Sequence, residues 1–204
     1  MNDYGLALML LLAYLIGATP TSYIAAKLGR GIDLREHGSK NLGATNVYRV
    51  LGWQYAIPVG VIDLAKGAVP VAILGPWSNG PRWFTVALGI AAVMGHMFSP
   101  YVHFRGGKGV ATSAGMFLAL APLAIAISIP IWAATLWLSG FVSVASLTVA
   151  VLFPVWVRLA TPDPFTFWAS VVLALLIVYA HRQNIGRLRQ GTESRFRTRK
   201  GVAA

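Results

Sequence analysis

The sequence predicts an all-α integral membrane protein, a compact bundle of about seven transmembrane helices. The chain has 204 residues, of which 56% are hydrophobic and only 11% charged, and its mean hydropathy is +0.64. Soluble domains carry about 25% charged residues, so a soluble fold is excluded. The hydrophobic content excludes disorder, and the absence of cysteine excludes a disulfide scaffold.

Apolar runs long enough to cross a bilayer follow one another along the chain. A spanning helix needs about 20 mainly apolar residues. The first run is too long for a cleaved signal peptide and lacks a basic segment before it. The sequence predicts helices over approximately 4–26, 54–74, 83–101, 110–121, 122–138, 141–159 and 165–180.

The net charge of +11 is concentrated in three segments, which predict the orientation of the chain. Of the 17 Lys and Arg residues, five lie in 27–49, two in 105–108 and seven in 182–200. The positive-inside rule assigns all three segments to the cytoplasm. An even number of crossings must then separate the last two segments, so 110–138 is expected to form two helices hinged near Pro122. The N-terminus is therefore predicted outside and the C-terminus inside.

The short helix at 110–121, the number of domains and the basic tail complete the predicted arrangement. The helix at 110–121 is short for a full span, and whether it crosses the bilayer or re-enters is left open. With no linker or repeat in the sequence, residues 1–204 are expected to form one domain. The basic tail, about 187–204, is expected in the cytoplasm, in contact with anionic lipid headgroups.

The first polar motif is GSKNLGATNVYR at 38–49. Gly38 and Gly43 permit positive φ angles and close backbone approach. Arg49 offers a planar fork that suits a phosphate or a carboxylate. A turn-rich connector that caps a helix is the alternative interpretation. The neutral hydrogen-bonding groups of the motif are Ser39, Asn41, Thr45 and Asn46.

The second polar motif is FRGGKGVAT at 104–112. Gly106, Gly107 and Gly109 surround Lys108 at the predicted start of a helix. This pattern is typical of an anion cradle formed by backbone N–H groups, the helix N-terminus and a point charge. It is not a Walker A loop, because Val102 stands where the first glycine should be. A plain interfacial turn remains the alternative.

The third polar motif, HRQNIGRLRQGTE at 181–193, follows the last span. His181 and Asn184 share one helix face and are interpreted as functional residues, and Glu193 is the only carboxylate in the three motifs. A snorkelling basic helix end is preferred for Arg182, Arg187 and Arg189.

Further polar residues lie inside predicted spans. Asp63 and Lys66 are functional candidates by default, but their spacing suits a local ion pair, which is preferred. His96 is interpreted either as a site residue or as a buried histidine paired with a neighbour. Ser143 and Ser146 share a helix face, where small hydroxyl residues usually join helices. No metal site is expected, because the chain has four scattered His and no Cys.

Taken together and in this order, the motifs resemble the bacterial acyl-phosphate:glycerol-3-phosphate acyltransferase family. The likeness covers nearly the whole chain. It adds GHxF at 95–98 and SxxS at 143–146 to the three motifs, the third of which ends in GTE at 191–193. Lys40 and Arg105 depart from the family pattern, where Gly and often Lys stand. Lys40 puts in doubt how tightly the first loop turns.

The resemblance implies an enzyme of the bacterial inner membrane that starts phospholipid synthesis. It would transfer a fatty acyl group from acyl-phosphate to the 1-hydroxyl of sn-glycerol 3-phosphate, as a monomer, without cofactor or nucleic acid, at a site facing the cytoplasm. The catalytic residues carried over are Ser39, Arg49, Lys108, His181 and Asn184. The substrate-binding residues carried over are Asn41, Thr45, Asn46, His96, Gly106, Gly107, Gly109, Ser143, Ser146 and Glu193.

The residues are consistent with this implied reaction. An acyl-phosphate is already activated, so positioning and charge stabilisation can replace a nucleophile. The absence of cysteine excludes a thioester intermediate, and HxxxxD occurs at none of the four histidines. The proton acceptor is either His181 or a substrate phosphate oxygen, and the latter is preferred. A transporter of a phosphorylated metabolite and a lipid-docking protein are the rival classes. The crowding of motifs on one membrane side favours the enzyme.

Overall fold

The computed structural model describes residues 3–196 and divides into two compact units on either side of Leu120. Unit 1 comprises Met1–Leu120 and unit 2 Ala121–Ala204. Within residues 3–196 every regular element is a helix and no strand occurs. The all-α prediction is therefore confirmed, whereas a single domain over 1–204 stays a prediction.

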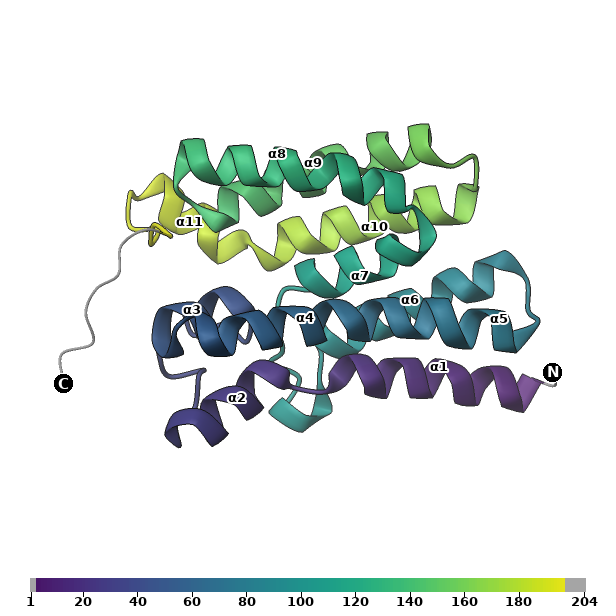
Figure 1. The fold of residues 1–204 in the computed structure, drawn as a ribbon, viewed down its shortest axis with the longest axis horizontal. Helices are drawn as coiled ribbons and strands as arrows, with labels where there is room; N and C mark the ends of the chain where they lie inside the picture. Colours follow the sequence, from purple (N-terminus) through teal and green to yellow (C-terminus); the bar gives the residue numbers. More distant parts are fainter. Residues whose placement is uncertain (1–2, 197–204) are drawn as a thin grey trace. The chain divides into compact units, whose positions relative to one another are not determined.

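Unit 1 consists of long apolar helices with shorter ones at both ends. Its helices are α1 (Asp3–Ala18), α2 (Thr21–Arg30), α3 (Ala44–Leu51), α4 (Trp53–Val69), α5 (Gly75–Ser78), α6 (Arg82–Met97) and α7 (Val110–Leu120). A π-helical turn, η1 (Pro70–Leu74), joins α4 to α5, and a 3-10 turn, η2 (Pro100–Val102), follows α6. The α2–α3 end, which carries the first polar motif, lies opposite the α5 end (Figure 1).

Glycine contacts hold the helices of unit 1 close together. A Cβ atom on Gly67 of α4 would overlap the backbone carbonyl of Thr112 in α7, and one on Gly115 would overlap that of Leu64. Gly17 and Gly95 make equivalent backbone contacts between α1 and α6. Such small-residue crossings are typical of helices packed in a bilayer, where burial of apolar surface does not drive association.

The structure interrupts the helix that the sequence predicts over 4–26. The chain leaves helical geometry between α1 and α2 because Pro20 has no N–H group and disfavours helical geometry at Thr19. The carbonyls freed by the break are paired by side chains. Ser99 Oγ donates to Ala18 O at 2.5 Å, and Lys66 Nζ donates to Thr19 O at 2.8 Å.

Unit 2 is a row of three long helices and one short helix. These are α8 (Pro122–Ser139), α9 (Val142–Ala160), α10 (Pro164–Ala180) and α11 (Arg182–Arg189), with α9 packed against both α8 and α10. Pro122 occupies the first turn of α8, so the predicted hinge in 110–138 is confirmed. The chain bends by 51° between α10 and α11, at His181.

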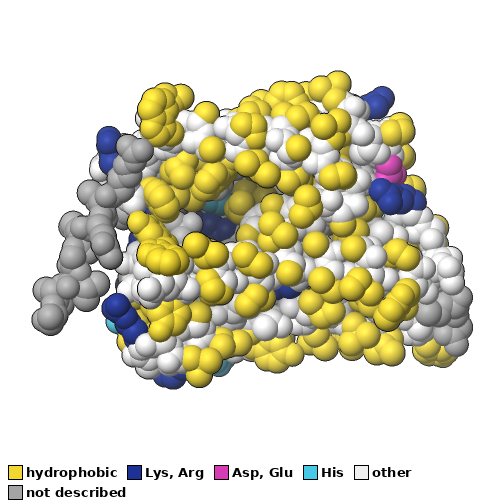
Figure 2. All heavy atoms as spheres, in the orientation of Figure 1, with side chains coloured by type: hydrophobic (Ala, Val, Ile, Leu, Met, Phe, Trp, Pro, Cys, Tyr) yellow, Lys and Arg dark blue, Asp and Glu magenta, His cyan; other side chains and the backbone are white. Residues whose placement is uncertain are grey.

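The long helices have the length and composition of membrane spans. Five qualify in the described chain: Asp3–Arg30, Trp53–Ser78, Arg82–Val102, Pro122–Ser139 and Val142–Ala160, and the bent pair α10–α11 is a sixth if it counts as one span. The 11 residues of α7 reach only about 16 Å, half of a hydrocarbon core of about 30 Å. Hydrophobic side chains cover the visible surface over α4 and α8 (Figure 2). Seven crossings and their orientation stay predictions.

Candidate active site

The predicted site residues fall in both units, and each unit is described by itself. Unit 2 carries the residues of the third motif together with Ser143 and Ser146. Unit 1 carries the first two motifs and His96. The unit 1 set is Ser39, Asn41, Thr45, Asn46, Arg49, His96, Gly106, Gly107, Lys108 and Gly109.

The first motif forms a loop organised around the buried side chain of Asn46. Asn46 Nδ2 donates to the carbonyls of His37 (3.0 Å) and Asn41 (3.1 Å). Its Oδ1 accepts the backbone N–H of Ser39 at 2.8 Å. Because its amide is engaged with the loop itself, Asn46 positions Ser39 and Asn41. These contacts argue against a direct substrate contact for Asn46.

The backbone of this loop turns differently from the prediction. Gly38 has a φ of +61°, and a Cβ there would overlap Asn46 Oδ1, so glycine is required. Gly43 does not use the positive φ that glycine permits, because its φ is −154°. Instead Lys40 adopts a φ of +60°, at a cost of about 1–2 kcal/mol for a side-chain-bearing residue. The loop therefore turns tightly despite Lys40.

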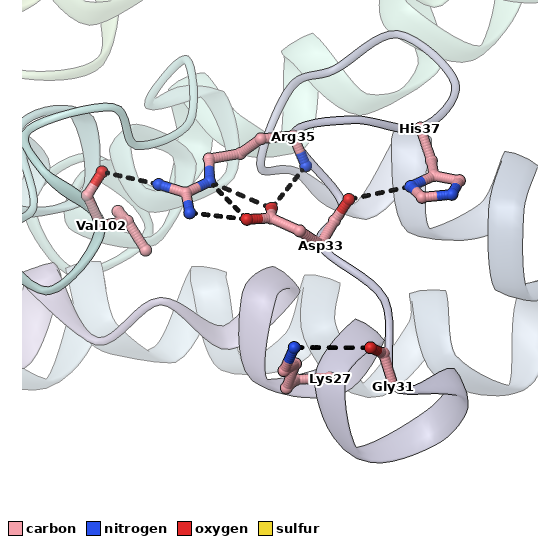
Figure 3. Close-up of polar contacts among 6 residues, drawn as sticks. All are labelled: Lys27, Gly31, Asp33, Arg35, His37 and Val102. Atoms are coloured by element: carbon pink, nitrogen blue, oxygen red, sulfur yellow. Dashed lines mark hydrogen bonds and ion pairs between the residues drawn. The ribbon is translucent and has the colours of Figure 1, made fainter.

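A clasp between Asp33 and Arg35 ties this loop to the turn before the glycine-rich segment (Figure 3). Arg35 Nη2 lies 2.6 Å from Asp33 Oδ2, and Arg35 Nη1 donates to Val102 O at 3.3 Å. The hydrogen bond from the Arg35 side chain lowers the pKa of Asp33 below its ordinary value. The sequence does not indicate this contact, because no pattern in it pairs Arg35 with Val102.

Replacing Arg35 by alanine is expected to loosen the first loop. The half-buried clasp would be lost, so we expect the free energy of unfolding to fall by about 1 kcal/mol. Thermal unfolding of the purified protein in detergent checks this, with Arg30→Ala as a control that removes a cation of the same region. Equal melting temperatures for the two variants would contradict the assigned role of Arg35.

The backbone N–H groups of Gly106 and Gly107 are already engaged. They donate to Met97 O and His96 O, each at 3.1 Å. A Cβ on Gly106 would overlap His96 O, and one on Gly107 would overlap the His96 ring. These glycines are therefore required by close approach to His96, and their N–H groups are not directed at an anion. What remains of the predicted cradle is Lys108, Gly109 and the first turn of α7.

Gly109 has the geometry that the motif predicts. Its φ is +79°, in the left-handed region that glycine favours, and α7 begins at the next residue. Lys108 is half-buried and directly precedes this turn. A helix N-terminus with an adjacent lysine favours a bound anion.

The charged pair inside α4 is confirmed as a local ion pair. Asp63 and Lys66 are 1% and 5% exposed, and Lys66 Nζ lies 2.8 Å from Asp63 Oδ1. Thr21 Oγ1 also donates to Asp63 Oδ1. Residues at the α1–α2 break thus provide a hydrogen-bond partner for each of the two charged groups: Thr19 O for Lys66 and Thr21 Oγ1 for Asp63.

His96 lies directly beneath the glycine-rich segment. It is 7% exposed, and its Nδ1 lies 3.8 Å from Asp63 Oδ1, so it is a buried histidine beside a charged neighbour. With Lys66, Gly106 and Gly107 it lines a small recess of about 210 Å³, a volume that includes the open mouth. This placement indicates a role in holding the segment.

Unit 2 gathers two predicted site residues, Ser143 and Asn184, and also Arg187 around the Glu193 carboxylate. Ser143 Oγ donates to Glu193 Oε1 at 2.8 Å, and Asn184 Nδ2 donates to the same oxygen at 2.6 Å. Arg187 Nε donates to Oε2 at 2.6 Å. The snorkelling interpretation is therefore wrong for Arg187, because its guanidinium faces this carboxylate.

The pKa of Glu193 lies below its ordinary value. Partial burial opposes ionisation, but hydrogen bonds from Asn184, Arg187 and Ser143 favour the charged form and outweigh it. The ionised carboxylate thus fixes the direction of the Asn184 amide.

Glu193 is expected to make folding sensitive to acid. Because its pKa is depressed, its stabilisation is complete above the ordinary pKa of 4.5 and is lost as the pH falls through the lowered value. Glu193→Gln should therefore melt below the wild type at about pH 7, and the difference should shrink towards about pH 3. The control is Glu36→Gln, which alters an exposed carboxylate. A pH-independent difference would contradict the prediction.

His181 and Ser146 are placed by contacts within unit 2. His181 is 3% exposed, and its Nδ1 lies 2.8 Å from Ile177 O, which assigns the proton to Nδ1. Nε2 is the other ring nitrogen and does not take part in this contact. Ser146 Oγ accepts from Trp132 Nε1 at 3.3 Å, a contact that joins α9 to α8.

Among residues 3–196, no three potential metal-ligating side chains come together.

Comparison with solved structures identifies the class of this fold. The chain is similar to two crystal structures of PlsY (YgiH), described as an integral membrane glycerol 3-phosphate acyltransferase. The glycerol 3-phosphate form matches with a TM-score of 0.88 and 36% identity, over 94% of this chain and 95% of that chain. The lysophosphatidic acid form matches with a TM-score of 0.86 and 34% identity, over the same shares. The protein is thus an integral membrane protein of the PlsY type.

Comparison of sequences then shows the family. The family model of glycerol-3-phosphate acyltransferase matches residues 7–191. The glycerol-3-phosphate acyltransferase of Desulforudis audaxviator is 43% identical over 202 residues, 98% of this chain and all of that protein. The one of Exiguobacterium sibiricum is 46% identical over 191 residues, 92% of each. The chain belongs to the glycerol-3-phosphate acyltransferase family.

Proposed function

We propose that the protein transfers a fatty acyl group from acyl-phosphate to the 1-hydroxyl of sn-glycerol 3-phosphate. The products are 1-acyl-glycerol 3-phosphate and inorganic phosphate, in the first step of phospholipid synthesis. The observation that carries the proposal is the family match over residues 7–191, which contains the first two polar motifs and residues 181–191 of the third. The acyl-phosphate donor rests on the resemblance of those motifs.

The cations of unit 1 are proposed to bind the substrate phosphates. Lys108 and Gly109, at the first turn of α7, are assigned to the phosphate of the acyl donor. Arg49, in the last turn of α3, is assigned with Lys108 to glycerol 3-phosphate, because its fork matches a phosphate bidentately. The hydroxyls of Ser39 and Thr45 and the amide of Asn41 are assigned to substrate oxygens.

The polar cluster of unit 2 is proposed to orient the acceptor. Asn184 is the substrate-contacting amide, and Glu193 holds it in place through the hydrogen bond at 2.6 Å. Ser143 shares that carboxylate oxygen. Nε2 of His181 is assigned to the attacking hydroxyl or to the donor carbonyl, because Nδ1 is turned towards Ile177.

The reaction needs few catalytic groups because the donor is a mixed anhydride. The acceptor oxygen attacks the acyl carbon, the carbon–oxygen bond to phosphate breaks, and phosphate leaves with the electron pair. We assign the hydroxyl proton to a phosphate oxygen of the substrate. Both oxygens of Glu193 are engaged in hydrogen bonds, so this carboxylate is a poor proton acceptor.

The test is an assay of the purified protein in lipid with acyl-phosphate and labelled glycerol 3-phosphate. We expect labelled 1-acyl-glycerol 3-phosphate with acyl-phosphate and none with acyl-CoA or acyl carrier protein as the only donor. No product with acyl-phosphate, or equal product with acyl-CoA alone, would contradict the proposal.

We also propose that the protein lies in the bacterial inner membrane with its active site facing the cytoplasm. It is proposed to act as a monomer, with one domain over residues 1–204. Part of the basic tail, 197–204, lies outside the described residues. The exposed cations of 27–49 support this orientation, because they lie at the end of unit 1 opposite α5.

Single cysteines test the orientation, because the natural chain has none. Glu36→Cys places a thiol in the exposed first loop, and Pro81→Cys places one at the exposed start of α6. We expect a membrane-impermeant maleimide to label position 81 in intact cells and position 36 only after permeabilisation. Labelling in the reverse order would contradict the proposed topology.

A further inference from the structure

The proposed reaction does not use the buried charge cluster, defined as Asp63, Lys66 and His96. All three residues lie inside apolar helices that have the length of membrane spans. Charges are unfavourable there, so they are rare and usually serve a function. The contacts of the cluster indicate what that function is.

Two elements fix the ion pair at the base of the cluster. Asp63 and Lys66 both lie on α4, and their partners Thr19 and Thr21 lie at the α1–α2 break. Lys66 Nζ donates to Thr19 O at 2.8 Å, and Thr21 Oγ1 donates to Asp63 Oδ1. With partners on both sides, Asp63 Oδ1 is held in one place next to His96.

His96 connects this carboxylate to the glycine-rich segment. Its Nδ1 lies 3.8 Å from Asp63 Oδ1, too far for a hydrogen bond but close enough for electrostatic orientation of the ring. The opposite side of the ring lies against Gly107, where a Cβ would lie only 2.8 Å from Cε1 and would overlap Nε2. The His96 carbonyl also accepts the Gly107 N–H at 3.1 Å.

Gly107 is enclosed from the other side as well. A Cβ on it would lie 2.5 Å from Leu42 O, in the first polar loop. Its backbone is therefore confined between that loop and the His96 ring. Because Lys108 is the next residue, the position of the ring determines where the Lys108 backbone begins.

We propose that the buried charge cluster is a positioning device for substrate phosphate binding. Asp63 and Lys66 orient His96, and His96 supports Gly106 and Gly107 so that Lys108 and the first turn of α7 meet the phosphate. All three are positioning residues, since none is proposed to touch the reacting atoms. This inference rests on the proposed function of Lys108.

The first test replaces His96 by leucine, which removes the polar ring but leaves the ion pair with its threonine partners. We expect the KM for acyl-phosphate, assigned to this segment, to rise about tenfold with kcat within about threefold. A residue that only stabilises the fold would change the amount of active protein, and therefore the apparent kcat, without changing KM.

The second test removes the base of the cluster without leaving a lone charge. Asp63→Asn with Lys66→Met is expected to raise the same KM by a similar factor. Adding His96→Leu to this double variant should change KM little further, because the three residues act through one path.

The matched control is Ser78→Ala. Ser78 is also buried and hydrogen-bonded in unit 1, but it lies at the opposite end, in α5 (Figure 1). We expect Ser78→Ala to lower the melting temperature and to leave both KM values unchanged.

Other outcomes would overturn the inference. Folded variants with KM values for both substrates within threefold of the wild type would do so. If His96→Leu does not fold, His96→Asn decides in its place, and failure of that variant to fold would assign the cluster to folding alone. A wild-type protein without activity would contradict the proposed function instead. Binding of inorganic phosphate to the same variants would then decide the inference.

Discussion

Replacing Lys108 by alanine is expected to lower kcat/KM at least about 100-fold, equivalent to about 2.7 kcal/mol of transition-state stabilisation. Lys108 is the cation at the first turn of α7, and the N–H groups of the two glycines before it are turned to backbone carbonyls. Stabilisation of the negative charge that develops on the leaving phosphate is therefore assigned to the Lys108 ammonium group. The measurement is steady-state kinetics with acyl-phosphate and glycerol 3-phosphate in lipid.

The control for this experiment is Arg105→Ala. Arg105 belongs to the same segment and carries the same charge, but its side chain is exposed. We expect its activity to stay within about twofold of the wild type, because exposed charges contribute little. A Lys108→Ala variant that retains most of its activity would show that another group binds the phosphate.

Replacing Gly115 by alanine is expected to destabilise unit 1 by about 3 kcal/mol. The new Cβ would overlap Leu64 O and lie 3.1 Å from Ala68 N, both on the backbone of α4. Backbone atoms cannot rotate away as a side chain can, so α7 must move as a whole. Since Lys108 precedes α7, activity should fall together with the melting temperature.

Gly186→Ala is the matched control because it makes the same chemical change inside a helix. No atom lies within 4 Å of a Cβ at this position, so we expect unchanged or slightly raised stability, by up to about 1 kcal/mol. Thermal unfolding and activity are measured for both variants. Equal melting temperatures would contradict the close crossing of α4 and α7.

The long helices could be predicted from the sequence because their signal is local. An apolar run of sufficient length and a proline at a first turn both act within one segment. The division of 110–138 at Pro122 depends in addition on the charges of the flanking segments, because these decide between one helix and two. The break at Thr19 and Pro20 carries the same kind of local signal, but the apolar run that continues on both sides outweighed it. The short helices α3 and α11 lie in polar segments, where hydropathy gives no indication of them.

The site could be predicted as a set of residues but not as a set of roles. Motif spacing selected Asn46, Gly107 and Glu193, but their hydrogen-bond partners decide what each can do. The amide of Asn46 is engaged by carbonyls of its own loop, and Gly107 contacts His96. Such partners depend on how helices cross, which one sequence without tertiary contacts does not specify. The Asp63–Lys66 pair was predicted because its partners are one helical turn apart.

The interrupted first span has a consequence for how the chain is made. In a bilayer, backbone carbonyls without donors cost several kcal/mol each. At the break the carbonyls of Ala18 and Thr19 accept side-chain hydrogen bonds, that of Thr19 in addition to one from the Thr21 N–H. The donors, Lys66 and Ser99, follow 47 and 81 residues later in the chain. During synthesis the N-terminal segment therefore emerges ahead of both donors. The hydrogen bonds of the break can form only once Lys66 and Ser99 are in place beside it. Completion of the first span is therefore coupled to assembly of α4 and α6.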